Sequence, residues 1–223
     1  VHSKNEQQKN ASNQVQTARI MANGDLLYHD GLYMSALQAD GSYDFTENFT
    51  YVKPWLKQAD LVLGDFEGTI NPDYPLSGYP LFNAPQSVTA AIKDAGYDVM
   101  DLAHNHILDS GLEGAFTTAD AFKKVGIDPI GVYEKPVRDK APLLIKNVNG
   151  IKVAILSYAY GYNGLESNLT DKEVADHLSN LDEKRMKAEI QRAEKEADIT
   201  VIMPQMGVEY RLEPTDEQVK LYH

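Results

Sequence analysis

The stretch from Tyr97 to Gly114, YDVMDLAHNHILDSGLEG, decides the fold of the chain. An apolar run leads directly into His104, Asn105 and His106, and an acid and a glycine follow before a helical pattern begins. A strand that ends in polar, ligand-capable side chains and precedes a helix is typical of α/β proteins, which bring their chemistry to the edge of a sheet. The stretch therefore predicts an α/β fold with a candidate site at the end of this strand.

Apolar runs and amphipathic stretches alternate on both sides of this strand, and this alternation predicts a mostly parallel central sheet flanked by helices. Asn149 and Gly150 separate two β-rich runs, which indicates a hairpin with a type I′ turn and so one antiparallel element. We expect strands over 18–22, 60–68, 97–103, 127–132, both arms of 142–160, and 198–207, and helices over 49–59, 86–96, 111–125 and 180–197.

The two ends of the sequence differ from the rest. Residues 1–17 are polar and rich in Asn and Gln, so we expect a disordered leader or linker there. Residues 18–223 are expected to form one domain. Thr215 and Gln218 have the spacing of a capping box, which predicts a helix that begins shortly before the last residue. The expectation is therefore a domain that lacks its C-terminal part.

The composition narrows the classes of partner and site. Lys and Arg number 21 against 33 Asp and Glu, and the resulting net charge of −12 disfavours nucleic acid and anionic lipid surfaces as general partners. The sequence has no cysteine, which excludes disulfides, thiolate zinc sites and cysteine nucleophiles. Acidic side chains can instead gather divalent cations.

Polar side chains follow four of the predicted strands. In chain order they are Asp25; Asp65 and Glu67; Asn105 and His106; and Gln205 and Glu209. Because the carboxyl ends of parallel strands meet at one edge of a sheet, we expect these side chains to converge. An oxygen-rich set with an imidazole suits a divalent cation such as Mn, Mg, Fe or Zn.

Two of these side chains have chemistry that fits a phosphoester site. Asn105 can bind a cation through its carbonyl oxygen while its amide donates to a phosphate, and His106 can protonate a leaving oxygen. Taken singly, such residues also have a structural interpretation. An acid after a strand is often a turn residue or helix cap, and His104 could simply pack or hydrogen-bond locally.

At these residues the sequence resembles the CapA/PgsA family of bacterial capsule synthesis proteins, which are associated with poly-γ-glutamate. That family is similar to the calcineurin-like metallophosphoesterases, so the resemblance implies a layered α/β sandwich. The segments that carry it are MANGDLLYHDGLY, LVLGDFEGTI, GYDVMDLAHNHILDSGLEG and VIMPQMGVEY with the following PTDEQ. Asn105-His106 followed by an acid and Gly-Leu is the most specific part.

The resemblance implies roles by position. Asp25, Glu67 and Asn105 would be metal ligands and His106 the catalytic group. Residues expected at the edge of the site are His29, Asp65, His104, Gln205 and Glu209. Gln205 departs from the family, many members of which have His there in a His-Trp-Gly-x-Glu pattern. Members also continue into a Gly-His-Pro-His-like segment that supplies imidazoles, so weak metal binding is expected of this chain.

Two functions follow from the resemblance. In the first, the chain is part of an extracytoplasmic protein of capsule or poly-γ-glutamate biosynthesis and export, and its site hydrolyses a phosphoester. Such a protein would be anchored at the cell surface through a membrane segment that is absent from this chain. The second is a non-catalytic assembly or export factor of a polymer synthase complex. Expected partners are the synthase membrane subunits and an anionic polymer, together with self-association into a homo-oligomer; nucleic acid is not expected.

Overall fold

The computed structural model describes residues 15–137 and 140–222. A first sheet contains four parallel strands in the order β1 (Ile20–Asp25), β2 (Leu61–Asp65), β3 (Val99–Asp101) and β4 (Asp128–Ile130). Asp25 pairs with Asp65, and Asp65 pairs with Asp101, so the carboxyl ends of three neighbouring strands are in register. The leader expected over 1–17 lies outside the described residues except for 15–17, which form no regular element.

A second sheet contains β5 (Leu144–Val148), β6 (Ile151–Ala159) and β7 (Ile199–Gln205) in that order. The hairpin between β5 and β6 is confirmed, and its turn residues Asn149 and Gly150 have φ of 53° and 90°, as a type I′ turn requires. β7 runs parallel to β6 and contains Pro204. Among the strands of the described residues, β7 pairs only with β6.

The expectation of one central sheet was wrong, because the strands divide between these two sheets. The two sheets pack face to face instead of pairing edge to edge. Leu63 of β2 and Val99 of β3 lie in one buried apolar cluster with Val153 and Ile155 of β6. Alternate side chains of β6 point the other way, so each face of this strand is covered by a different layer.

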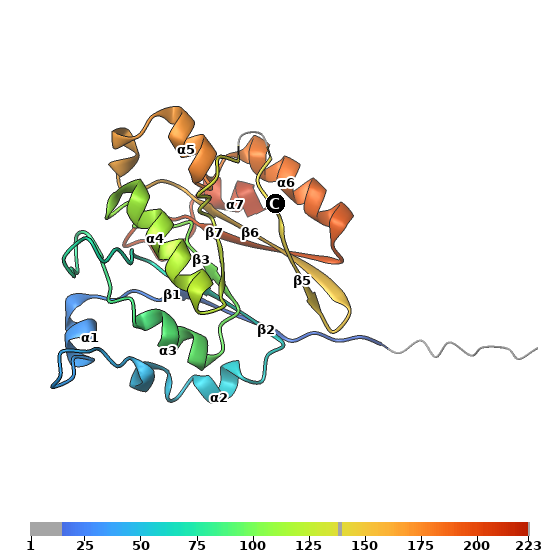
Figure 1. The fold of residues 1–223 in the computed structure, drawn as a ribbon. Helices are drawn as coiled ribbons and strands as arrows, with labels where there is room; N and C mark the ends of the chain where they lie inside the picture. Colours follow the sequence, from blue (N-terminus) through green and yellow to red (C-terminus); the bar gives the residue numbers. More distant parts are fainter. Residues whose placement is uncertain (1–14, 138–139, 223) are drawn as a thin grey trace, which may run out of the picture.

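Helices cover the outer faces of both sheets (Figure 1). On the first sheet, α3 (Val88–Ala95) and α4 (Gly111–Lys124) pack on Met100 and its neighbours. On the second sheet, α6 (Glu183–Glu196) packs its Met186 and Ala193 against β6. The result is a four-layered sandwich of helices, sheet, sheet and helix. The remaining helices are α1 (Asp30–Ser35), α2 (Lys53–Leu56), α5 (Asp171–His177) and α7 (Asp216–Tyr222), with short 3-10 turns at Thr46–Phe49 and Leu165–Asn168.

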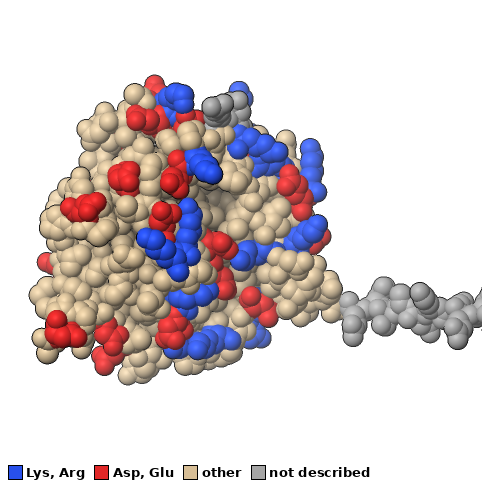
Figure 2. Space-filling model, in the orientation of Figure 1, with Lys and Arg blue, Asp and Glu red and all other residues tan. Residues whose placement is uncertain are grey.

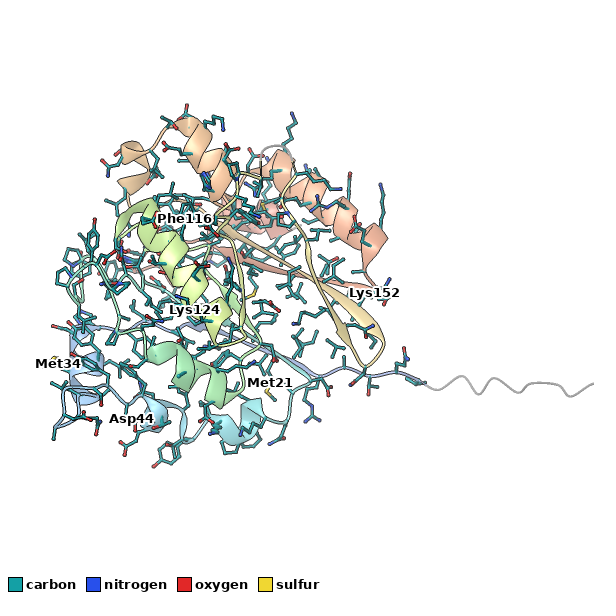
Figure 3. The ribbon with its side chains drawn as sticks, viewed as in Figure 1. Met21, Met34, Asp44, Phe116, Lys124 and Lys152 are labelled. Atoms are coloured by element: carbon teal, nitrogen blue, oxygen red, sulfur yellow. The ribbon has the colours of Figure 1, made fainter. Side chains whose placement is uncertain are left out.

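Local sequence signals explain where several helices begin and end. Gly96 ends α3 in the left-handed conformation with φ of 118°, as expected for a helix C-cap. The predicted capping box before α7 is present, since the Gln218 backbone N–H donates to Thr215 Oγ1 at 3.2 Å. The single helix expected over 49–59 is instead a 3-10 turn followed by the short α2, with Pro54 in its first turn. Phe116 of α4, labelled in Figure 3, packs its ring against the His177 ring of α5, with 5.2 Å between the ring centroids.

Candidate metal centre

Three carboxylates meet where β1 and β2 end. Asp25 is the last residue of β1, Asp65 is the last residue of β2, and Glu67 follows two residues later. One oxygen from each of these side chains lies within 4.8 Å of the other two. The backbone continues the strand pairing beyond the sheet, because the Leu26 N–H donates to the Asp65 carbonyl oxygen at 2.8 Å. The acidic groups are therefore held by the sheet itself.

Asp25 is exposed, but the burial of Asp65 and the partial burial of Glu67 make this cluster electrostatically costly without a cation. Asp65 is only 7% exposed, and burial, followed by the charges of Asp101, Asp25 and Glu67, raises the pKa of its carboxyl to about 9. Burial and Asp25 likewise raise the pKa of Glu67 to about 7. Asp65 Oδ1 is buried and has no hydrogen-bond partner. A divalent cation would both balance these charges and give this oxygen a partner, so the side chains fit a metal.

His106 is oriented by a neighbouring acid. Its Nδ1 donates to Asp109 Oδ2 at 2.8 Å, and the same oxygen accepts the Phe82 backbone N–H at 2.6 Å. The Phe82 ring packs edge-on against the imidazole, with 4.8 Å between the ring centroids. On the other side of the ring, His106 Nε2 lies 3.9 Å from Glu67 Oε1. Burial lowers the pKa of His106, but the hydrogen bond and the charges of Asp109 and Glu67 outweigh it and raise the pKa overall. Nε2 therefore faces Glu67 and the acidic cluster.

Two other predicted edge residues lie beside this group. His104 is fully buried, and burial lowers the pKa of its imidazole to about 3, so the ring is neutral. Its Nδ1 accepts the His106 backbone N–H at 3.1 Å. This is the local hydrogen-bonding role that the sequence left open for His104. His29 is exposed and pairs with Asp30, and its ring centroid lies 5.6 Å from that of Phe82. Phe82 thus joins the rings of His29 and His106.

Asn105 and Gln205 are bonded to each other. The Asn105 backbone N–H donates to Gln205 Oε1 at 2.8 Å, and Gln205 Nε2 donates to Asn105 Oδ1 at 2.7 Å. Asn105 Nδ2 also donates to Asn163 Oδ1 at 3.1 Å. Glu209 lies in the exposed segment after β7, where its charge contributes to raising the pKa of His106.

Asp109 and Asn163 also belong to this site, although the sequence patterns did not indicate them. Asp109 was noted only as the acid after the histidines, although its spacing of three residues from His106 is a usable signal for a side-chain bond in a turn. Asn163 lies 58 residues from Asn105 in the sequence, and no local pattern indicates that pairing. The individual ligand and catalytic roles expected for Asp25, Glu67, Asn105 and His106 stay predictions.

Comparisons with known proteins agree with this architecture. A family described as bacterial capsule synthesis protein PGA_cap matches residues 19–223. The capsule biosynthesis protein CapA of Bacillus anthracis is 30% identical over 182 residues, which cover 78% of this chain and 43% of that protein. The PGA biosynthesis protein CapA of Bacillus subtilis is 27% identical over 176 residues, 78% of this chain and 46% of that protein. The chain thus spans less than half the length of these relatives.

Two solved structures share the fold at low sequence identity. The calcineurin-like phosphoesterase YfkN of Bacillus subtilis has a TM-score of 0.51 at 16% identity, covering 88% of this chain and 64% of that chain. A putative 5'-nucleotidase of Staphylococcus aureus has a TM-score of 0.53 at 15% identity, and the match covers 88% of this chain and 39% of that chain. The family match extends over almost all described residues, and the sandwich is that of the phosphoesterases. The chain therefore belongs to the bacterial capsule synthesis protein family PGA_cap and has a calcineurin-like phosphoesterase fold.

Proposed function

We propose that this chain carries the site of a metal-dependent phosphoesterase acting in capsule or poly-γ-glutamate biosynthesis. The observation that carries the proposal is the meeting of Asp25, Asp65 and Glu67 beside His106, whose ring is fixed by Asp109. Family membership supports the biosynthetic setting, and the phosphoesterase fold supports the reaction class. Because a fold does not establish a reaction, the side chains carry the argument.

Each side chain has a distinct task in this proposal. Asp25, Asp65 and Glu67 would hold the cation, which when bound would polarise a phosphoryl oxygen and activate water. In its doubly protonated form His106 gives the Nε2 proton to the departing oxygen, while Asp109 accepts the Nδ1–H and holds the ring with Nε2 toward the acidic cluster. Phe82 covers one edge of the imidazole and limits its rotation.

The proposed setting is extracytoplasmic, at the cell surface, with the synthase membrane subunits as partners. No helix among residues 15–137 and 140–222 is long and apolar enough to span a membrane. Acidic and basic side chains are mixed on the face shown in Figure 2, and the whole chain has a charge of −12. An anionic polymer would therefore meet the chain through a cation or a partner protein more readily than through charge attraction on this face.

The test is hydrolysis by Mn²⁺-loaded protein of a phosphoester with an alcohol leaving group, such as glycerol 2-phosphate, because an alkoxide needs a proton to depart; released phosphate is measured. His106→Ala should keep bound metal and lose turnover by about 10²–10⁴-fold, the usual contribution of a general acid. His177→Ala serves as the control, because it makes the same change at a half-buried histidine outside the proposed site. The His177 imidazole lies on α5 and bonds the Tyr133 carbonyl oxygen. Metal content measured on the same samples separates loss of chemistry from loss of the cation.

One observation favours the alternative of a non-catalytic assembly factor. The carbonyl oxygen of Asn105, expected to be a ligand, already accepts a hydrogen bond from Gln205. If metal-loaded wild type shows no turnover on any phosphoester, and Asp25→Ala in cells still supports polymer export, the phosphoesterase proposal is wrong and the assembly role remains.

A further inference from the structure

A cavity of about 620 Å³ lies where an edge of the first sheet meets an edge of the second. Its walls come from β4, from β5 and β6, and from the chain between β4 and β5. As far as the structure describes the chain, no residue of the metal centre lines this cavity. Its volume falls within the range of small-molecule sites in proteins, which is about 300–1,000 Å³. The cavity is therefore a candidate for a second binding site.

The cavity begins where β5 and β6 separate. The last pair of their ladder is Leu144 with Ile155, and the same register would place Pro142 opposite Ser157. Proline has no N–H to donate, so the ladder ends before this position. Pro142 and Ser157 both line the cavity, which therefore contains a short stretch of unpaired strand edge.

The backbone N–H of Ser157 points into this gap. The Tyr160 N–H bonds β7, whereas the Ala159 N–H donates to the Ser179 carbonyl oxygen at 2.8 Å, so Ala159 and Ser157 face the opposite edge of β6. The Ser157 carbonyl oxygen confirms this direction, since it accepts Ser179 Oγ at 2.6 Å. The Ser157 N–H donates to no other group of the described chain. Because Ser157 is only 4% exposed, an oxygen atom of a ligand would give this donor the acceptor that it lacks.

The walls of the cavity are mostly apolar. Ile130 and Val132 line it on the side of the first sheet, and Leu144 and Ile155 line it on the side of the second. Val137, in the chain between β4 and β5, is half-buried at the same cavity. Such a lining favours an aliphatic ligand body, because the ligand removes apolar surface from water on both sides.

Positive charge gathers at this cavity, although the whole chain has a charge of −12. Three exposed lysines line it: Lys123, Lys135 and Lys140. Lys123 pairs with Asp120 at 3.3 Å, and the exposed Glu134 can balance one more. The other acid of the lining, Glu189, is already bonded to Arg185 Nε at 2.9 Å and to the Tyr158 hydroxyl at 2.7 Å. A positive excess remains, which favours an anionic group on the ligand.

We propose that this cavity binds a medium-chain aliphatic carboxylate. One carboxylate oxygen accepts the Ser157 N–H, the lysines balance the charge, and the chain lies against the apolar walls. A carboxylate supplies both the missing acceptor and the negative charge. The proposal does not involve the metal centre, so it stands or fails separately from the phosphoesterase function.

The test is a titration of the full chain with octanoate, followed by calorimetry and by the amide resonances of isotope-labelled protein. We expect saturable binding and a large shift of the Ser157 amide proton, because this proton gains an acceptor. Octanol has the same chain length without the carboxylate. It should bind at least about tenfold more weakly, since the hydrogen bond to a charged group is lost.

Two variants place the ligand in this cavity. Val137→Trp puts a large side chain into the cavity and should abolish binding, whereas Val52→Trp, at a position 46% exposed beside α2, should match wild type. Lys135→Glu should weaken binding several-fold at low salt. Its control is Lys152→Glu, the same change at the exposed lysine labelled in Figure 3, which does not line the cavity.

Each other outcome overturns the proposal. Absence of saturable octanoate binding to wild type would do so, even where Val137→Trp does not fold. Binding that leaves the Ser157 amide proton unshifted would place the ligand elsewhere. Equal affinity for octanol would remove the role of the carboxylate. Tighter binding of a γ-linked glutamate oligomer than of octanoate would show that the lysines serve an anionic polymer and that the apolar walls do not select the ligand.

Discussion

Asp65 shows how one residue can link folding to function. It ends a strand whose every residue is buried, so the sheet holds its carboxyl against Asp25 and Asp101 on the neighbouring strands. Burial raises the pKa of Asp101 to about 8, so this acid also resists ionisation. Such a concentration of acids opposes folding when ionised and becomes favourable when a cation is present.

The metal-free protein should therefore lose stability as the pH rises. Unfolded Asp and Glu ionise near their ordinary pKa values of 3.8 and 4.5, whereas the folded pKa values are about 9 for Asp65, 8 for Asp101 and 7 for Glu67. Raised folded values give stability that is fully present below pH 4 and is lost between about pH 4 and pH 9. Thermal unfolding in a chelator should show this decline, and Mn²⁺ should reduce it.

Asp65→Asn provides the check on this pH dependence. It removes the carboxyl with the highest pKa of these three acids, so the decline in the chelator should become shallower. Because the substitution also removes a proposed ligand, Mn²⁺ should no longer stabilise the variant. An unchanged slope in the variant would mean that this cluster does not set the pH response.

At the level of elements, glycines allow the strand ends to approach the site closely. Gly131 follows β4 with φ of +92°, and a Cβ there would lie 2.6 Å from the Ala103 backbone nitrogen. Ala103 directly precedes the histidine segment, and the Leu102 N–H donates to the Ile130 carbonyl oxygen at 2.9 Å. The turn after β4 is therefore packed against the turn that carries His104 to His106.

Gly131→Ala should destabilise the protein and disturb the site. Positive φ costs a residue with a Cβ about 1–2 kcal/mol, and overpacking against backbone adds about 1–3 kcal/mol. Gly164→Ala is the matched control, since Gly164 has φ of +81° but open space around its Cβ position. Chemical unfolding of both variants isolates the packing cost, and equal losses would show that Ala103 yields without strain.

At the scale of the whole molecule, features set by neighbouring residues could be predicted from the sequence, whereas features set by long-range contacts could not. Strand positions, the Asn149–Gly150 hairpin and the polar strand ends could be predicted because apolar runs and turn residues report on near neighbours. The division into two sheets could not, since it depends on which faces of β2 and β6 meet across the core. The bond from Gln205 to Asn105 spans 100 residues and exists only once that sandwich has formed.

Pro204 lies in β7 and should also affect how the protein behaves in concentrated solution. The Gln205 carbonyl oxygen accepts the Tyr160 N–H at 3.1 Å, so the alternation along β7 turns the Pro204 nitrogen toward the edge that pairs with no other strand of the described residues, where it offers no donor. Ile199 and Ile202 are 43% and 37% exposed along the same strand. An edge with these side chains would otherwise be a template for stacking of further copies into fibrils.

Pro204→Val should therefore shorten the time for which agitated protein stays soluble, because valine restores the missing N–H and favours extended strands. Light scattering and amyloid-dye fluorescence would follow the loss of soluble protein. Pro142→Val, at an exposed position outside the strands, is the control. If the two variants aggregate at the same rate, the proline does not protect this edge. If only Pro204→Val forms fibrils, a single missing hydrogen on the outer strand of the described second sheet is what keeps this chain dispersed.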